Sequence, residues 1–407
     1  MKRLTLLLLG LALGVSATAG AQGLTMQMSN GWAFQFSGNV NVFWSFTKQN
    51  NSGPANSNVR TGLLPSFATF EARGKEGGLN LGVHFGFAPQ IQNFNSVHDQ
   101  FGTQIDMRQV YLTVGFKNGS QVLAGRELAL FGRQNILQDM TLFGVGAVGI
   151  GGGQGGGTTL GRIGYGYIYP NFNAQVTYST KPGQSQLSIG VFQPSIAIGD
   201  RLASGACVGG VAGPTCAYTF TKIPRVEAEF TYNQKSGKNN YMFWVGGLWQ
   251  STSNAASGGN TASSFGGTAG IKAGMQDLSV VVTGYIGKGL GTTLMFSGNE
   301  VAANGTDLRK SDGGYVQLTY KLGPKTTVGG SWGFSRLVNN ETGDGNTNVR
   351  SNLYSYTAGV YHQWTKSLKF VVEGTQEGTT GETAGLFAGL APGTKQIDLA
   401  AGFMLFY

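Results

Sequence analysis

The segment Gln396–Tyr407, QIDLAAGFMLFY, indicates the fold class. Apolar residues recur at every second position of this segment, namely at Ile397, Leu399, Ala401, Phe403, Leu405 and Tyr407. A period of two is typical of a β-strand with one apolar face. The terminal residues of a soluble domain commonly fray in water, so an apolar strand that continues to the last aromatic residue is unusual there. The pattern therefore predicts that the last strand is part of a wall in contact with lipid.

The amino terminus has the features of a secretory signal peptide. Lys2 and Arg3 precede an apolar stretch over residues 4–15, and Ala19-Gly20-Ala21 forms a small-residue cleavage site. We predict cleavage after Ala21, which leaves residues 22–407 as one domain. A membrane anchor is disfavoured because the apolar run is short and ends in small residues. No later stretch has 18 continuous apolar residues, so no transmembrane helix is predicted.

The composition favours a membrane β-sheet protein. Charged residues make up 12% of the chain, compared with about 25% in an ordinary soluble domain. Glycine accounts for 68 of the 407 residues without a collagen repeat, and the formal net charge is +9. A soluble β-sandwich is the alternative, but sandwiches rarely carry so many long and evenly spaced strands. An exported, glycine-rich chain of low charge predicts a single large β-barrel.

Segments of alternating hydrophobicity recur along the chain, as in residues 67–73, 110–116 and 315–322. Together with their neighbours they offer the roughly 9–11 residues that a tilted strand needs to cross a bilayer. Seven short turns alternate with eight long loops, which requires sixteen antiparallel strands with the short turns on the periplasmic side. The first strand, Gly31–Phe46, is expected to pair with the last, because an open edge in lipid leaves backbone groups unsatisfied.

One aromatic segment affects this strand count. Residues 162–180 alternate in polarity, but the parity of the apolar residues changes at Pro170. We interpret the segment as one strand with a bulge at Pro170, since one extra residue moves the side chains to the opposite face. Two strands with a turn would make seventeen and place the remaining turns on the wrong side.

The longest connection, Glu127–Gly161, is the third long loop and contains both apolar residues and a glycine run. Its apolar residues include Ile136, Leu137, Met140, Leu142 and Phe143, with Asp139 among them. We predict that this loop folds into the lumen, where the apolar side chains pack on the inner wall and Asp139 faces the pore. The glycines allow turns that other residues resist. A flexible surface loop is the alternative.

Charged residues on the inward parity of the strands are candidates for lining the pore. The predicted pore-lining residues are Glu71, His84, Arg225, Glu227, Lys272, Lys321 and Lys369, and the acids Glu229, Glu373 and Asp398 share that parity. Opposed charges across a narrow lumen discriminate between ions by sign, and the net positive charge favours anions. The alternative is that many of these charges only solvate the lumen and one another.

The sequence gives little support for catalysis or metal binding. His84, His98 and His362 are far apart and lack metal-ligand spacing, and no G-x-S-x-G motif occurs. We therefore predict no enzyme activity, cofactor or metal. Cys207 and Cys216 fall in one loop of an exported chain, so we predict that they form a disulfide.

The mature chain resembles the general Gram-negative porins, which are trimeric, sixteen-stranded diffusion channels. The resemblance rests on AGREL at Ala124–Leu128, GRIGYGYIYPN at Gly161–Asn171 and the aromatic carboxyl terminus. It implies that Arg126 belongs to the basic cluster of the pore constriction, with Arg73 and Arg162 in similar places. The acidic PEFGG-type stretch of the family is absent from the third loop, which leaves Glu127 and Asp139 as the acidic candidates.

The resemblance also implies function and partners. We expect an outer-membrane porin that admits small hydrophilic solutes and ions passively, prefers anions and forms a homotrimer in outer-membrane lipid. The strand ending at Tyr407 is expected to be recognised by the barrel-assembly machinery. No nucleic-acid partner is expected. A substrate-specific channel is one alternative, and an outer-membrane barrel enzyme or adhesin is another.

Overall fold

The computed structural model describes residues 23–29, 31–50, 53, 55–92, 105–151, 157–194, 221–253, 261–296, 300–302, 307–338, 343–344, 350–381 and 392–407. The predicted signal peptide, residues 1–21, and the predicted disulfide between Cys207 and Cys216 lie outside these residues.

The described part of the chain is built almost entirely of β-strands. The strands are β1 (Leu24–Gln27), β2 (Ala33–Gln49), β3 (Ala55–Arg60), β4 (Phe67–Glu76), β5 (Leu79–Pro89), β6 (Ile105–Gly115), β7 (Gln121–Leu128), β8 (Phe172–Ser179), β9 (Ser185–Phe192), β10 (Arg225–Ser236), β11 (Asn239–Ser253), β12 (Thr261–Met275), β13 (Leu278–Lys288), β14 (Lys310–Leu322), β15 (Thr326–Val338), β16 (Arg350–Gln363), β17 (Leu368–Gly381) and β18 (Lys395–Phe406). Helix α1 (Arg133–Leu137) and the 3₁₀ helix η2 (Met140–Phe143) lie between β7 and β8. Within the described residues, no helix is long and apolar enough to cross a membrane.

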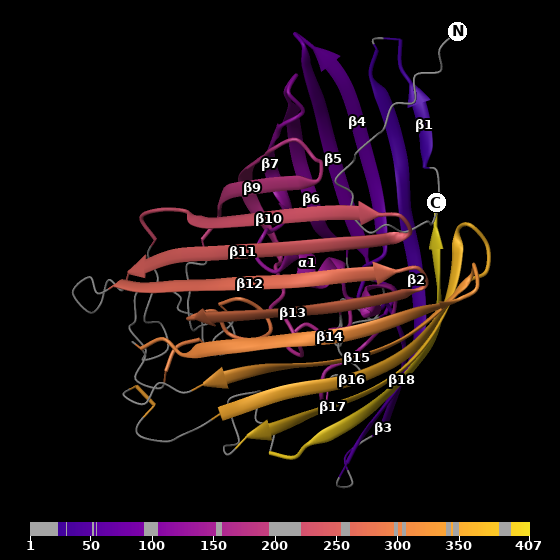
Figure 1. Cartoon of the computed structure of the whole chain (residues 1–407), viewed down its shortest axis with the longest axis vertical. Coiled ribbons are helices and arrows are strands. Elements are labelled where there is room, and N and C mark those ends of the chain that lie inside the picture. Colours follow the sequence, from indigo (N-terminus) through magenta and orange to yellow (C-terminus); the bar gives the residue numbers. More distant parts are fainter. Residues whose placement is uncertain are drawn as a thin grey trace.

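Strand β2 and strands β4–β18 close into an antiparallel barrel of sixteen strands, as predicted. Each barrel strand pairs with its successor, β9 pairs with β10, and β18 returns to β2. The short strands β1 and β3 pair with parts of β2 and add to the sheet without changing the barrel. In Figure 1 the strands β10–β14 run across the view, whereas β4 and β5 run steeply along it, as expected for tilted strands in different parts of a barrel wall.

The pairing of the last strand with the first is confirmed. The register runs from Gln396 opposite Gln49 to Phe406 opposite Asn39. Beyond it, Tyr407 donates its N–H to the Gly38 carbonyl at 3.1 Å and accepts from the Gly38 N–H at 3.0 Å. The terminal aromatic residue therefore continues the ladder that closes the barrel.

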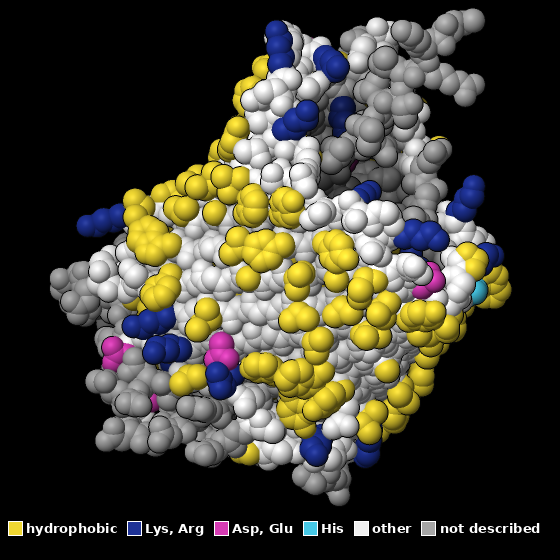
Figure 2. Space-filling model, in the orientation of Figure 1, with side chains coloured by type: hydrophobic (Ala, Val, Ile, Leu, Met, Phe, Trp, Pro, Cys, Tyr) yellow, Lys and Arg dark blue, Asp and Glu magenta, His cyan; other side chains and the backbone are white. Residues whose placement is uncertain are grey.

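The strand alternation produces two surfaces. Along β18, Leu399 is 45% exposed on the outside, whereas the adjacent Asp398 is 2% exposed on the inside. Apolar residues on other strands, such as Leu112, Trp332 and Val360, are likewise exposed. Apolar side chains cover much of the outer face over β10–β18 in Figure 2. This distribution is that of a barrel whose outer face contacts lipid.

The interpretation of residues 162–180 as one bulged strand is wrong in its first half. Strand β8 begins at Phe172, and the preceding residues form turns in which Gly161 and Gly164 have φ values of 58° and 80°. Tyr165 and Tyr167 are buried there. Alternating aromatic residues can pack within a loop as well as along a strand, and left-handed glycines favour the loop. The count of sixteen is unaffected, because the segment belongs to the third loop.

A charge placed on the outer face tests its contact with lipid. Leu399→Arg is expected to lower the free energy of unfolding in lipid vesicles by roughly 2–4 kcal/mol, because the guanidinium would lie in hydrocarbon. Urea titration of the refolded barrel measures this, and Leu399→Ala is the control that removes the side chain without adding charge. Equal stability of the two variants would contradict a lipid-facing position.

Candidate functional site

The described residues of the third loop, 129–151 and 157–171 between β7 and β8, lie against the inner wall of the barrel. Its buried apolar residues include Ile136, Met140 and Leu142, which belong to one cluster with Val371 of β17 and Met404 of β18. Several of its other contacts are polar, and many of these involve the backbone of the loop. Apolar packing therefore fixes the loop on one side of the interior, and polar side chains from the wall decide its path.

Glu227 of β10 binds the start of the loop. Its Oε2 atom accepts backbone N–H groups from Leu130 at 2.9 Å and from Phe131 at 2.8 Å. Its Oε1 atom lies 2.8 Å from the Nε of Arg225, so the buried carboxylate has both a cation and two amide donors beside it. A buried charge needs such partners to offset its loss of hydration.

Glu373 of β17 binds the middle of the loop in the same way. Its Oε2 accepts the N–H groups of Val145 and Gly146, each at 2.7 Å, and its Oε1 accepts from the Tyr361 hydroxyl. A Cβ at Gly144 would lie 2.2 Å from Glu373 Oε1, so glycine is required for this close approach.

Three further inward side chains accept backbone N–H groups along the glycine-rich part of the loop. Val148 donates to Asp398 at 3.1 Å, Gly149 to Glu377 at 3.0 Å and Gly151 to Gln396 at 3.0 Å. The sequence showed the inward parity of Glu227, Glu373 and Asp398 but not this role. A glycine run without side-chain acceptors of its own is the signal that could have suggested it.

Asp139 lies in the packing of the loop and not on an open pore surface, and it is 3% exposed. Its Oδ1 accepts the Thr141 N–H at 2.9 Å at the start of η2, and its Oδ2 accepts from the Tyr167 hydroxyl at 2.8 Å. Burial raises the pKa of the Asp139 carboxyl, and the charge of Arg162 opposes this in part. Asp139 therefore connects the helical first part of the loop to Tyr167 in its last part.

Arg162 is fully buried beside the same wall. Its Nε donates to Ser331 Oγ at 2.9 Å and its Nη1 donates to Ser355 Oγ at 3.2 Å, while the guanidinium carbon lies 5.9 Å from the ring centre of Tyr315. Burial lowers the pKa of this guanidinium. Arg162 therefore attaches the end of the loop to β15 and β16.

A polar network on β4–β7 brings four predicted residues together. Glu71 pairs with Arg73, and its Oε1 lies 2.8 Å from His84 Nδ1. His84 Nε2 lies 3.3 Å from Gln109 Oε1, and Gln109 donates from Nε2 to Glu127 Oε2 at 2.8 Å. Within this network Arg73 is 34% exposed at its side chain, whereas Glu71 and His84 are buried. Arg73 is therefore the more solvent-accessible member of the Glu71–Arg73 ion pair.

The inward lysines differ from the inward acids. Lys272 Nζ donates to Gln138 Oε1 at 2.9 Å, Lys369 Nζ lies 4.0 Å from the ring centre of Phe143, and Lys321 is exposed. Among the residues that the structure describes, none of these three lysines forms an ion pair. Their positive charges are thus not neutralised by the inner wall.

Arg126 does not lie where the resemblance implied. Arg126 lies on β7, its cross-strand neighbours are Val110 of β6 and Ala174 of β8, and its side chain is exposed. The next residue, Glu127, points inward to Gln109, and successive side chains of a strand point to opposite faces. Arg126 therefore belongs to the outer surface of the barrel and not to the lumen.

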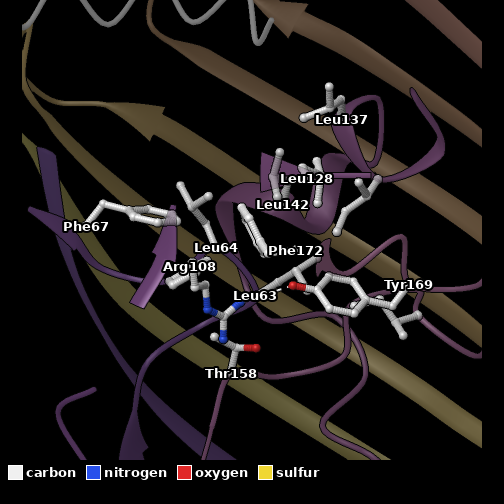
Figure 3. Close-up of a pocket in the computed structure, with 13 residues that line it drawn as sticks. Leu63, Leu64, Phe67, Arg108, Leu128, Leu137, Leu142, Thr158, Tyr169 and Phe172 are labelled. Atoms are coloured by element: carbon white, nitrogen blue, oxygen red, sulfur yellow. Dashed lines mark hydrogen bonds between the residues drawn. The ribbon is translucent and has the colours of Figure 1, made fainter. Parts of the chain in front are cut away.

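A pocket lies behind the loop, enclosed by residues 63–67 and by strands β6 and β8 (Figure 3). Arg108 extends into it, donates from Nη1 to the Tyr169 hydroxyl at 3.2 Å and lies 5.7 Å from the ring centre of Phe172. A register shift opposite Gly86 makes Arg108 the extra residue of a bulge, which turns it inward. Strand parity alone could not have placed it there.

A comparison with protein-family models supports the assignment that the fold suggests. The model described as "Gram-negative porin" matches residues 6–382. The chain belongs to the Gram-negative porin family. No curated protein sequence matches the porin significantly. Its family and its barrel are those of an outer-membrane channel.

Solved structures share the fold at low sequence identity. The outer membrane channel DcaP of Acinetobacter baumannii is 14% identical with a TM-score of 0.63, and the alignment covers 94% of this chain and 99% of that one. The anion-selective porin from Comamonas acidovorans is 14% identical with a TM-score of 0.61, over 92% and 100% of the two chains. The trimer form of OmpT from Vibrio cholerae is 14% identical with a TM-score of 0.52, over 93% and 100%.

Removing the Glu373 carboxylate is expected to loosen the middle of the loop. Glu373→Ala leaves the N–H groups of Val145 and Gly146 without their acceptor, and a hydrogen bond to a charged group contributes about 1.5–3 kcal/mol. Amide hydrogen exchange of a peptide spanning these residues should accelerate by about tenfold or more. Thr375→Ala is the control, since Thr375 bonds to Thr357 on the same wall. Unchanged exchange would show that packing alone holds the loop.

Proposed function

We propose that this porin is a passive diffusion channel for small hydrophilic solutes and ions, that it prefers anions, and that it works as a homotrimer without a cofactor or catalytic role. In this proposal residues 1–21 direct export and are removed, and the strand that ends at Tyr407 is recognised by the assembly machinery. The anion preference is supported by a difference between the inward acids and the inward lysines. The acids are bonded by backbone N–H groups or by cations, whereas the three lysines form no ion pair among the described residues.

The acids contribute little negative charge to a permeating ion. Glu227 and Glu373 are buried and accept two backbone N–H groups each, and Glu229 is buried against Arg133. Glu71 is paired with Arg73. Carboxylates neutralised by such donors have a weak field in the lumen, because the nearby dipoles and cations oppose it.

The lysines act on permeating ions directly. Lys272, Lys321 and Lys369 come from β12, β14 and β17, face inward and form no ion pair among the described residues. In a narrow lumen with low-dielectric walls, uncompensated positive charge raises the local concentration of anions.

This proposal revises the expected constriction. We propose that the third loop narrows the lumen, that Arg73, Lys272 and Lys369 are the charges that ions meet beside it, and that Asp139 and Arg162 hold the loop in place. Two of the similar solved structures are described as an anion-selective porin and as a trimer form, which is consistent with both parts of the proposal.

Ion selectivity in a planar bilayer tests the proposal. The reversal potential in a potassium chloride gradient should indicate anion preference, and Lys272→Gln with Lys369→Gln should reduce the anion-to-cation permeability ratio several-fold. Lys48→Gln is the matched control, because Lys48 is an exposed lysine on the outward parity of β2. Cation preference of the unmodified porin would refute the electrostatic reasoning, and absence of conductance by a folded barrel would refute the channel.

A further inference from the structure

His84 of β5 lies between polar side chains of the two neighbouring strands. Its Nδ1 atom is 2.8 Å from Oε1 of Glu71 on β4, and its Nε2 atom is 3.3 Å from Oε1 of Gln109 on β6. His84 is 5% exposed, and its ring stacks on that of Tyr111 with the centres 4.7 Å apart. Because burial and stacking fix the orientation of the ring, each ring nitrogen keeps its own partner.

Glu127 of β7 decides which end of the Gln109 amide faces His84. The Oε2 atom of Glu127 accepts from Gln109 Nε2 at 2.8 Å, and its Oε1 atom accepts the backbone N–H of Leu128 at 2.8 Å. A glutamine amide has one end that donates and one end that accepts. Since the donating end of Gln109 is bonded to the Glu127 carboxylate, its carbonyl oxygen is the atom that faces His84.

Both nitrogens of His84 therefore face oxygen atoms that act as acceptors. A neutral imidazole carries one N–H donor and one lone pair, so it would direct the lone pair at one of these oxygens. The imidazolium ion carries two N–H donors, which match the Glu71 carboxylate on one side and the Gln109 carbonyl on the other. The hydrogen bonds of this network therefore fit the charged form of His84.

The proton on His84 decides the net charge of the network. With the imidazolium, the two carboxylates of Glu71 and Glu127 are matched by the two cations of Arg73 and His84. With a neutral imidazole, one negative charge remains in excess. Among the described residues, the titratable and charged groups around His84 are Glu71 and Arg73 of β4, Tyr111 of β6 and Glu127 of β7, and Arg133 of α1 acts electrostatically on Glu127.

We propose that His84 is an imidazolium ion in the working porin and that its charge sets the strength of the anion preference on this side of the lumen. This role rests on the proposed function and makes His84 a specificity-determining residue that permeating ions do not have to touch. Protonated His84 compensates Glu127, so Arg73 acts on ions beside a network without excess negative charge. Rising pH removes the proton, and the resulting negative network attracts cations and weakens the anion preference.

Nitrogen NMR measures the charge of His84 directly. The chain contains three histidines, so the refolded barrel with isotope-labelled histidine gives few signals, and those missing from His84→Gln belong to His84. If His84→Gln does not fold, variants of His98 and His362 assign the remaining signals by elimination. Both ring nitrogens of His84 should carry a proton at neutral pH. One protonated and one unprotonated nitrogen would overturn the proposal.

Ion selectivity in a planar bilayer tests the consequence of this charge. His84→Gln should lower the anion-to-cation permeability ratio by about twofold or more, whereas His84→Lys, which keeps a positive charge, should retain most of the ratio. His362→Gln is the matched control, because His362 bonds to Thr326 on the outward parity of β16. An unchanged ratio in folded His84→Gln would contradict the proposal.

The pH profile separates the charge of His84 from a structural role. The permeability ratio of the unmodified porin should shift towards cations over the pH range in which the imidazolium signals of His84 disappear, and His84→Gln should lack this step. A step of equal size in His84→Gln would assign the pH dependence to other groups and overturn the proposal. If the unmodified porin prefers cations at every pH, the anion preference of the proposed function fails, while the presence or absence of this step still decides the role of His84.

Discussion

Backbone N–H and C=O groups in the membrane-spanning wall and in the buried part of the third loop must find partners without bulk water, and this constraint shapes both the barrel and its contents. In the wall, each strand satisfies its neighbours, and the pairing of β18 with β2 leaves no open edge. Inside the barrel, several backbone N–H groups of the described third loop are not part of a strand ladder. Glu227 and Glu373 supply acceptors for these N–H groups from the barrel wall. Inward side chains therefore satisfy the loop backbone, as neighbouring strands satisfy the backbone of the wall.

The same hydrogen bonds compensate the negative charges of the interior but not the positive ones. A carboxylate that accepts two amide N–H groups is stabilised where it is buried, and its field on a passing ion is reduced. Lysine has only donors, so it cannot bind an amide N–H and has no corresponding role in holding the backbone of the loop. Lys272, for example, donates to the side chain of Gln138 and keeps its charge uncompensated. A wall with acids and bases in similar number can therefore present a positive lumen.

Features that depend on strand periodicity could be predicted from the sequence. The count of sixteen strands and the first-to-last pairing follow from a period of two and from the need to close the edge. Arg126 was misplaced because the resemblance of AGREL to a family motif was given more weight than parity, which puts Arg126 and Glu127 on opposite faces. Residues 162–171 were misread because tyrosines packed between loop and wall alternate in the same way as tyrosines on a strand.

Long-range partners lie beyond such patterns. The bond between Glu373 and Val145 joins residues 228 positions apart, and no local signal in the chain specifies it. Composition nevertheless limits the possibilities, since glycines offer backbone N–H groups but no side-chain acceptors, and the N–H groups of Gly146, Gly149 and Gly151 are bonded by distant side chains. The bulge at Arg108 is an irregularity that strand parity does not reveal. Parity would place Arg108 on the outer face, but the unpaired residue turns its side chain to the inside. Parity therefore places a charged residue on the lumen or outer side only where the strand register is unbroken, and each irregularity has to be located in the structure before a charge is assigned to either side.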